Sequence, residues 1–229
     1  MTQHLKHVLC LVLALAAVVG AKAALSYEAS NNAGSSAGGI RFDKEIGIDY
    51  AKQTLSAATY FIHKLFQQTN DADMKPVQKI SMVVENIEGF AYASNSVIHV
   101  SAAYIEHFPG DVKNEITGLL YHELTHLLQW DANGKAPSGL IEGIADFVRL
   151  KAELAPKTWA PVGRGDNWDQ GYEITAHFLD YCNGIKDGFV AELNKRLKND
   201  YNDSYFNDIL EKPVSQLWGE YKAKYATPM

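Results

Sequence analysis

The sequence predicts an α+β fold in which a short strand-rich segment is followed and preceded by helices. Residues 79–84 carry the β-branched and apolar residues of a buried strand, and residues 90–93 and 97–101 form a predicted hairpin around Ser94-Asn95-Ser96. Apolar residues spaced three and four apart predict helices over most of the remaining chain, at about 43–68, 111–130, 139–154, 168–183, 188–198, 203–211 and 213–224.

The length and composition indicate one globular domain. The chain has 229 residues, of which 47% are hydrophobic and 11% aromatic, and this is enough to bury a sizeable core. Ser30–Gly39 is rich in Ser, Asn and Gly, so we expect an irregular lead-in there. We predict a single domain over residues 24–229.

The first 23 residues have the features of a secretory signal peptide. Val8–Val19 is an unbroken apolar run, and Ala21-Lys22-Ala23 offers small residues for cleavage. The run is too short to span a membrane. We therefore expect a secreted, extracellular protein with no membrane association after cleavage, and the alternative is an interfacial anchor helix.

Charge and cysteine content limit the partners. The formal net charge of −6 becomes −8 once Lys6 and Lys22 leave with the signal peptide, which argues against nucleic acid as a partner.

Cys182 is then the only cysteine, so no internal disulfide is possible and we expect it to be buried. Asn202-Asp203-Ser204 is the one glycosylation sequon. We expect a monomer.

The segment His122-Glu123-Leu124-Thr125-His126 lies well inside the predicted helix 111–130. Histidines four apart project from one helix face, so both imidazoles can reach a single Zn²⁺ while Glu123 contacts a water without binding the metal. Zinc in such a site lowers the pKa of water to about 7, which favours hydrolysis. The alternative is two solvated histidines and a surface glutamate, but the leucines in the same turns leave little room for it.

A catalytic zinc needs a third protein ligand, and the next predicted helix, 139–154, supplies the best candidate. It is apolar nearly all round, yet Glu142, Asp146 and Arg149 form one polar stripe. Acids are rarely buried unless they are paired or bind metal. We expect Glu142 to bind zinc and Asp146 to hold a histidine ring nitrogen. Two alternatives stay open: Asp146 itself as the ligand, or an Asp146–Arg149 pair with Glu142 at the surface.

With these motifs in place, the chain resembles the gluzincin metallopeptidases and, more closely, the plant basic secretory protein family of secreted peptidases linked to pathogen defence. The closer resemblance covers about residues 26–225 and depends on several motifs that keep their order. They are Tyr121-His-Glu-Leu-Thr-His126, Gln129-Trp130, Gly139-Leu-Ile-Glu-Gly-Ile-Ala-Asp146, Trp168-Asp-Gln-Gly-Tyr172 and Phe178-Leu-Asp-Tyr-Cys-Asn-Gly184. The chain departs from the family's name in being acidic.

The resemblance implies a zincin-like metallopeptidase fold, with a small mixed sheet, an active-site helix beneath it and a mostly helical C-terminal half. It implies one catalytic Zn²⁺ held by His122, His126 and Glu142, with Glu123 as the general base. It also implies a peptide or protein as substrate.

Two further expectations concern substrate binding. In zincins an edge strand above the metal pairs with an extended peptide, so by resemblance residues 91–93 or 98–100 take this part, unless the hairpin is purely structural. In gluzincins a tyrosine or histidine beyond the third ligand stabilises the oxyanion, and Tyr172 is the best candidate here.

A second class of function remains open: a secreted defence or cell-wall binding protein with a structural or non-catalytic zinc. Such a zinc normally has a fourth protein ligand, which Cys182 or His177 could supply. We expect His99 and His107, like His177, to be structural. A third alternative is a zinc hydrolase acting on non-peptide amides.

Overall fold

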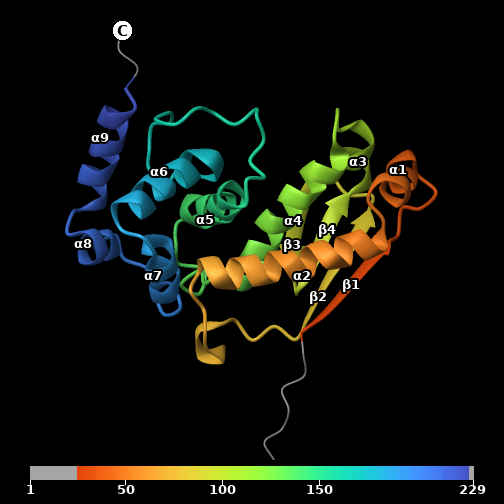
Figure 1. Ribbon diagram of the computed structural model, residues 1–229, viewed down its shortest axis with the longest axis horizontal. Helices are drawn as coiled ribbons and strands as arrows, with labels where there is room; N and C mark the ends of the chain where they lie inside the picture. The colour runs from red at the N-terminus through yellow and green to blue at the C-terminus, as the bar shows by residue number, and fades with distance from the viewer. Residues whose placement is uncertain (1–24, 227–229) are drawn as a thin grey trace, which may run out of the picture.

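The computed structural model describes residues 25–226, so the predicted signal peptide, 1–23, lies outside the described residues. The elements, labelled in Figure 1, are β1 (Ser26–Asn31), α1 (Ala37–Glu45), α2 (Ile48–Leu65), a short 3-10 turn η1 (Asp71–Asp73), β2 (Lys79–Glu85), β3 (Ala91–Ser94), β4 (Val97–Ser101), α3 (Ala102–His107), α4 (Val112–Leu128), α5 (Ser138–Lys151), α6 (Tyr172–Ile185), α7 (Phe189–Arg196), α8 (Ser204–Leu210) and α9 (Val214–Lys224).

The four strands form one mixed sheet with the order β1-β2-β4-β3. β1, β2 and β4 run parallel, and β3 is antiparallel to β4 across a turn in which Asn95 and Ser96 both have positive φ. β3 therefore lies at one edge of the sheet. The prediction of an α+β fold with a small mixed sheet and a mostly helical C-terminal half is confirmed.

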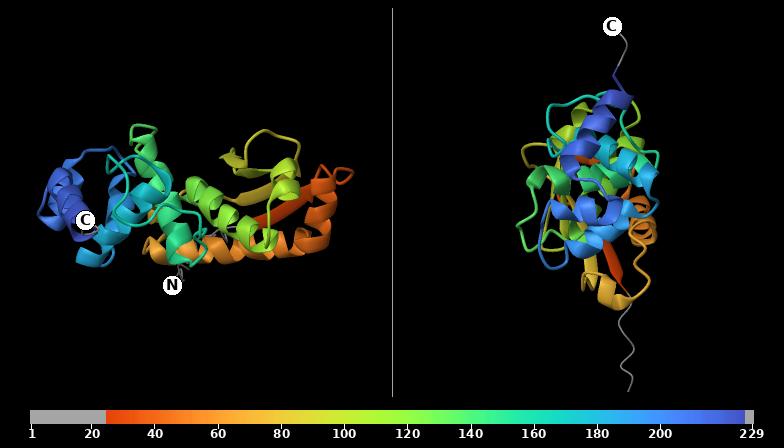
Figure 2. Two further views of the ribbon diagram at one scale, coloured as in Figure 1. Left: turned by 90° about the horizontal axis from the view of Figure 1, so that it is seen from above. Right: turned by 90° about the vertical axis from the view of Figure 1, so that its left-hand side faces the viewer.

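The sheet and the C-terminal helices occupy opposite ends of an elongated molecule (Figure 2). α2 lies lengthwise along one face, where it packs against β1 and α4. α4 also contacts β3 and β4 on one side and α5 on the other, so it joins the two ends. α5 in turn packs on α6, and α6 contacts α7 and α9.

One hydrophobic core runs through both ends, from Ala33 and Phe42 to Leu217 and Tyr221. α5 is buried on nearly all sides, as its apolar composition predicts, and Phe147 is completely inaccessible. The apolar helices α4 and α5 are thus fixed in the middle of the molecule. Among residues 25–226, no helix combines the length and the apolar character that a membrane span requires.

Two local predictions are wrong near the N-terminus. The lead-in predicted at Ser30–Gly39 contains the end of β1 and the start of α1, whose first turn is capped by the Ser36 side chain accepting from Gly39 N at 3.0 Å. The single helix predicted at 43–68 is two helices, because the chain turns at Gly47 with a φ of 79°.

One short helix, α3, was not predicted at all. α6 was predicted, but it begins at Tyr172 instead of at residue 168, because residues 168–171 form a turn. α4, α5, β2, β3 and β4 agree with the predicted segments to within a few residues.

Candidate metal centre

α4 and α5 pack antiparallel, and polar side chains of both helices meet along the seam between them. Near the start of α4, Glu115 pairs with Arg149, which lies near the end of α5. At the other end of the seam, Gln129 donates to the carbonyl oxygen of Ile141 in the first turns of α5. His122 and His126 lie between these two contacts.

The local sequence explains why α4 presents these histidines. Asp111 caps the helix by accepting from Asn114 N at 3.0 Å, and the apolar residues Ile116, Leu120 and Leu124 are completely buried. Helix geometry then places His122 and His126 one turn apart on the same face, toward α5.

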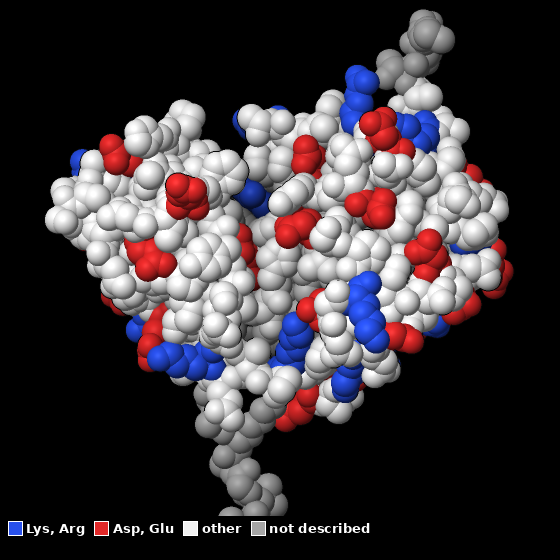
Figure 3. Space-filling model, turned by 180° about the vertical axis from the view of Figure 1, so that it is seen from behind, with Lys and Arg blue, Asp and Glu red and all other residues white. Residues whose placement is uncertain are grey.

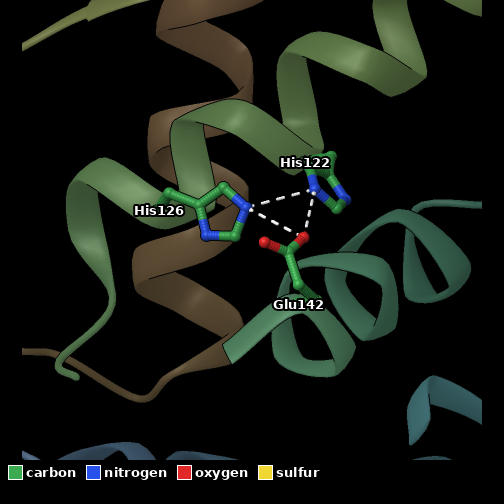
Figure 4. Close-up of side chains that lie close together, drawn as sticks. All are labelled: His122, His126 and Glu142. Carbon is green, nitrogen blue, oxygen red and sulfur yellow. Dashed lines mark hydrogen bonds and ion pairs between the residues drawn. The ribbon is translucent and has the colours of Figure 1, made fainter. Parts of the chain in front are cut away.

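Three side chains converge at this point (Figure 4). His122 Nε2 lies 3.1 Å from Glu142 Oε2 and 3.1 Å from His126 Nε2, and His126 Nε2 lies 3.4 Å from Glu142 Oε2. The three atoms form a nearly equilateral triangle. A tetrahedral ion bound at about 2.0–2.1 Å holds its ligands about 3.3 Å apart, so the donor set and the spacing both fit zinc.

Asp146 contacts the opposite ring nitrogen of His122. Its Oδ1 lies 2.7 Å from His122 Nδ1, and both side chains are buried. The carboxylate accepts from Nδ1–H, so Nε2 is the ring nitrogen that faces His126 and Glu142. Burial lowers the pKa of His122, but the hydrogen bonds to Asp146 and Glu142 outweigh it and raise the pKa to about 9.

The two glutamates of the site are perturbed in opposite directions. Burial raises the pKa of Glu123, and the neighbouring His122 and His126 only partly counter this effect. Burial also acts on Glu142, but its hydrogen bonds to the two histidines lower its pKa to about 2. Glu142 is therefore an anion under all physiological conditions. The raised pKa of Glu123, in contrast, makes this carboxylate a better proton acceptor.

The cluster lies on the floor of a cleft of about 1150 Å³. The surface is hollowed between the two ends of the molecule, and acidic side chains gather around the hollow (Figure 3). β3 forms one wall, and the loop residues 155–159 with Tyr172 form the other.

The edge strand β3 lies along this cleft with its open side available. Phe90, Ala91, Tyr92 and Ala93 all line the cleft, and Phe90 and Tyr92 are exposed. β4, in contrast, pairs with β2 on one side and β3 on the other. The prediction that residues 98–100 pair with a peptide is therefore wrong, because their backbone groups already form hydrogen bonds with β2 and β3.

Tyr172, the first residue of α6, faces the cluster of His122, His126 and Glu142. Its ring is parallel to that of His122 at a centroid distance of 6.3 Å, and its side chain is exposed to the cleft. The charge of Glu142 raises its pKa, so the hydroxyl stays protonated and can donate. The turn that precedes Tyr172 packs directly against Gly139 at the start of α5. A Cβ at Gly139 would lie only 1.8 Å from the Asp169 carbonyl oxygen of this turn, so a larger residue would push the turn away.

The other candidate side chains lie outside the cluster. His99 bonds Glu85 and stacks on Tyr92, and His107 contacts the carbonyl oxygen of Ala103. His177 packs edge-on against Trp159. Cys182 is completely buried in α6, and burial raises its pKa far above the ordinary value.

A second polar cluster in the cleft, made by Tyr104, Glu115 and Arg149, was not predicted from the sequence. Arg149 pairs with Glu115 at 2.9 Å, not with Asp146 as the alternative interpretation had it, and Tyr104 donates to the other oxygen of Glu115 at 2.8 Å. Glu115 lies two turns before His122 on the same helix face, and this spacing is the one signal that could have revealed it.

Comparisons with known proteins identify the family of this chain. A family described as peptidase of plants and bacteria matches residues 22–221. A basic secretory protease of Boswellia serrata is 47% identical over 58 residues, which make up 25% of this chain and 66% of that protein's length. No solved structure matches. Because the family match covers nearly the whole chain, the protein belongs to this family of peptidases of plants and bacteria.

Proposed function

We propose that this protein is a secreted, zinc-dependent metallopeptidase with a zincin-like fold. In this proposal His122, His126 and Glu142 hold the metal, Glu123 is the general base, and Asp146 orients His122. The observation that carries the proposal is the triangle of three donor atoms, 3.1–3.4 Å apart, on the floor of an open cleft. The peptidase family and the protease name of the relative support it.

Glu142 is favoured over Asp146 as the third ligand. Glu142 approaches both histidines at Nε2, the nitrogen that faces the cleft, whereas Asp146 contacts His122 at Nδ1 on the far side of the ring. One ion cannot contact both nitrogens of the same imidazole. A carboxylate behind a histidine ligand is a common way to fix its tautomer.

A bound Zn²⁺ would supply the acidity that makes water nucleophilic near neutral pH and would polarise the scissile carbonyl. Glu123 takes the proton from the attacking water and delivers it to the leaving amine, and its raised pKa suits both steps. Tyr172 donates from its hydroxyl to the developing oxyanion.

The substrate is a peptide in an extended conformation. The open side of β3 offers backbone N–H and C=O groups along the cleft, and a peptide added there becomes a fifth strand. The exposed side chains of Phe90 and Tyr92 provide apolar contact beside it.

Secretion is supported by the predicted signal peptide and by the name of the Boswellia serrata relative. The role in defence against pathogens follows from the family resemblance alone.

The alternative, a binding protein with a structural zinc, is less well supported. A structural zinc has four protein ligands. Within residues 25–226, the one group of candidate ligands that converges is His122, His126 and Glu142, and neither Cys182 nor His177 belongs to it. The remaining side of the triangle faces the cleft.

The proposal is tested by incubating purified, zinc-loaded protein with a peptide library, with and without a chelator, and identifying products by mass spectrometry. We expect cleavage that the chelator abolishes. Glu123→Gln keeps the shape but not the base, so we expect retained zinc and a rate lower by about 10²–10⁴-fold. Chelator-resistant cleavage, or none by zinc-loaded wild type, would favour the binding-protein alternative.

A further inference from the structure

The side chains that line the cleft carry far more negative than positive charge. The charged residues among them are Asp111, Glu115, Glu123, Glu142, Asp146, Glu153 and Glu173, against Arg149 and Lys157. Arg149 is paired with Glu115, and three of the acids belong to the proposed metal centre. Asp111, Glu153 and Glu173, here called the outer acids, remain, and in the described part of the chain Lys157 alone is left in the cleft to balance them. A cleft lined in this way attracts positively charged ligands.

Two of the outer acids are exposed and have no cationic partner within the described chain. Asp111 accepts from Asn114 N at 3.0 Å, which is a neutral backbone donor. Glu153 is exposed just beyond the end of α5, four residues after Arg149. Among residues 25–226, no lysine, arginine or histidine forms an ion pair with either carboxylate. Both can therefore attract a cation that the chain itself does not supply.

Arg149 shows how this cleft holds a positive charge. Its guanidinium carbon lies 6.0 Å from the centre of the Trp159 ring, and its Nη2 lies 2.9 Å from Glu115 Oε2, so a ring and a carboxylate hold the cation together. Phe90 presents a second aromatic ring to the same part of the cleft. This exposed ring lies 4.6 Å from the ring of Tyr104, which donates to Glu115.

The lining residues also indicate how far a peptide extends from the metal centre. On α4 they run from Asp111 to His126, which at 1.5 Å per residue is a distance of about 22 Å. An extended peptide of about six or seven residues covers this length. Glu115 and Asp111 lie about 10 and 16 Å before His122 on the helix, so they face substrate residues about three to five positions from the scissile bond.

We propose that the cleft selects cationic peptides, in which a lysine or arginine three to five residues from the scissile bond is held by Asp111 and Glu153. The apolar stem of that side chain packs on the ring of Phe90, and its charged end lies near the two carboxylates. These contacts are on one side of the scissile bond, because the metal centre lies near one end of the cleft. The inference names the substrate class of the proposed peptidase, and it rests on that proposed function.

The test compares synthetic peptides that share one sequence cleaved in the library and carry Lys, Gln or Glu at each position on either side of the scissile bond. With zinc-loaded wild type we expect kcat/KM to be about 10–100-fold higher for Lys than for Glu at positions three to five on one side, with Gln between them. This ratio should fall toward one as NaCl rises from about 0.05 M to about 0.5 M, because salt screens exposed charges.

A pair of variants tests whether the two outer acids cause the preference. Asp111→Asn with Glu153→Gln removes both charges, while asparagine caps a helix as well as aspartate does, and we expect the Lys-to-Glu ratio to fall by about 3–10-fold. Asp49→Asn with Glu211→Gln is the matched control. It removes the same charge from exposed acids at the start of α2 and the end of α8, and Glu211 has a φ of 58°, close to the 60° of Glu153. The control should keep the wild-type ratio.

The outcomes separate this inference from the proposed function. Equal kcat/KM for the Lys and Glu peptides, or a wild-type ratio in the folded Asp111, Glu153 double variant, overturns the inference and leaves the peptidase intact. If the double variant does not fold, Glu153→Gln alone decides by the same ratio, because this residue lies beyond the helix end. Zinc-loaded wild type that cleaves no peptide of the library overturns the proposed function, and the inference with it.

Discussion

Two polar clusters lie in the seam between α4 and α5, about two turns apart, and they balance their charge differently. In the first, Glu115 is neutralised inside the protein by Arg149 and accepts a further bond from Tyr104. In the second, the carboxylates of Glu142 and Asp146 bond only to histidine rings, and within residues 25–226 no lysine or arginine pairs with them.

The difference shows how one pair of helices serves both stability and binding. The Glu115–Arg149 pair is closed, since both side chains are at most 10% exposed and the positive charge comes from the chain itself. The cluster of His122, His126 and Glu142 is open, since Glu142 is 29% exposed and the cleft around it is rich in acidic side chains. The first cluster supplies its own cation, and we propose that the second takes its cation from solution.

The largest effect is expected where the open cluster loses a ligand. Glu142→Ala removes one corner of the triangle, and we expect bound zinc to fall from about one equivalent toward none, as measured by elemental analysis after gel filtration. Glu153→Gln, which changes an acid that also lines the cleft, serves as the control and should keep its zinc. Unchanged zinc in Glu142→Ala would transfer the ligand role to Asp146.

The closed cluster should respond in stability instead of in metal content. Arg149→Met leaves the charge of Glu115 buried and uncompensated, and breaking a buried pair in this way costs about 3–5 kcal/mol in the free energy of unfolding. Urea denaturation measures this loss.

The double variant Glu115→Leu, Arg149→Met removes both charges and should recover most of the lost stability, because the desolvation cost disappears with them. A single variant Arg149→Met as stable as wild type would mean that the pair is not the closed, buried cluster described above.

The metal-free protein should also show a pH dependence that originates in the open cluster. The pKa of His122 is raised to about 9 by its bonds to Asp146 and Glu142, which outweigh the effect of burial, while in the unfolded chain it is about 6.5. Protonated His122 thus stabilises the fold fully below pH 6.5, and this contribution is lost as the pH rises through 9.

Zinc should reverse this trend, because a proton and the metal compete for the same histidine and zinc affinity therefore rises with pH. Thermal unfolding at pH 6 and pH 9.5, with and without zinc, measures both signs. Stability of the metal-free protein that is flat across this range would contradict the assignment of the His122–Asp146 bond.

The parts of the fold that local sequence predicts are those buried by regular apolar spacing. β2, α4 and α5 were located in this way because each buries a continuous apolar face. β1 was missed because alternate residues along its whole length are exposed, and only pairing with β2 defines it. α1 was missed because its glycines suggest irregular structure, whereas Gly38 allows a close approach to the Ala102 carbonyl oxygen, where a Cβ would lie at 1.8 Å.

The same limit applies to the site. The convergence of His122, His126 and Glu142 could be predicted because helical spacing fixes the first two and a polar stripe in an apolar helix marks the third. The Glu115–Arg149 pair could not be predicted, because it depends on the antiparallel packing of α4 on α5. Such contacts belong to the tertiary structure.

The smallest of these effects, and the sharpest test of the open cluster, comes from Asp146. Asp146→Leu removes the acceptor behind His122, so we expect zinc affinity to fall by about 10–100-fold, while Asp146→Asn keeps an acceptor and should fall less. The closed cluster provides the contrast, because Tyr104→Phe removes a hydroxyl bond to Glu115 and should leave zinc affinity unchanged. Chelator competition on all three variants gives the order directly. Equal affinities for the Leu and Asn variants would mean that Asp146 fills space behind the ring, since a positioning role requires the acceptor oxygen that only Asn retains.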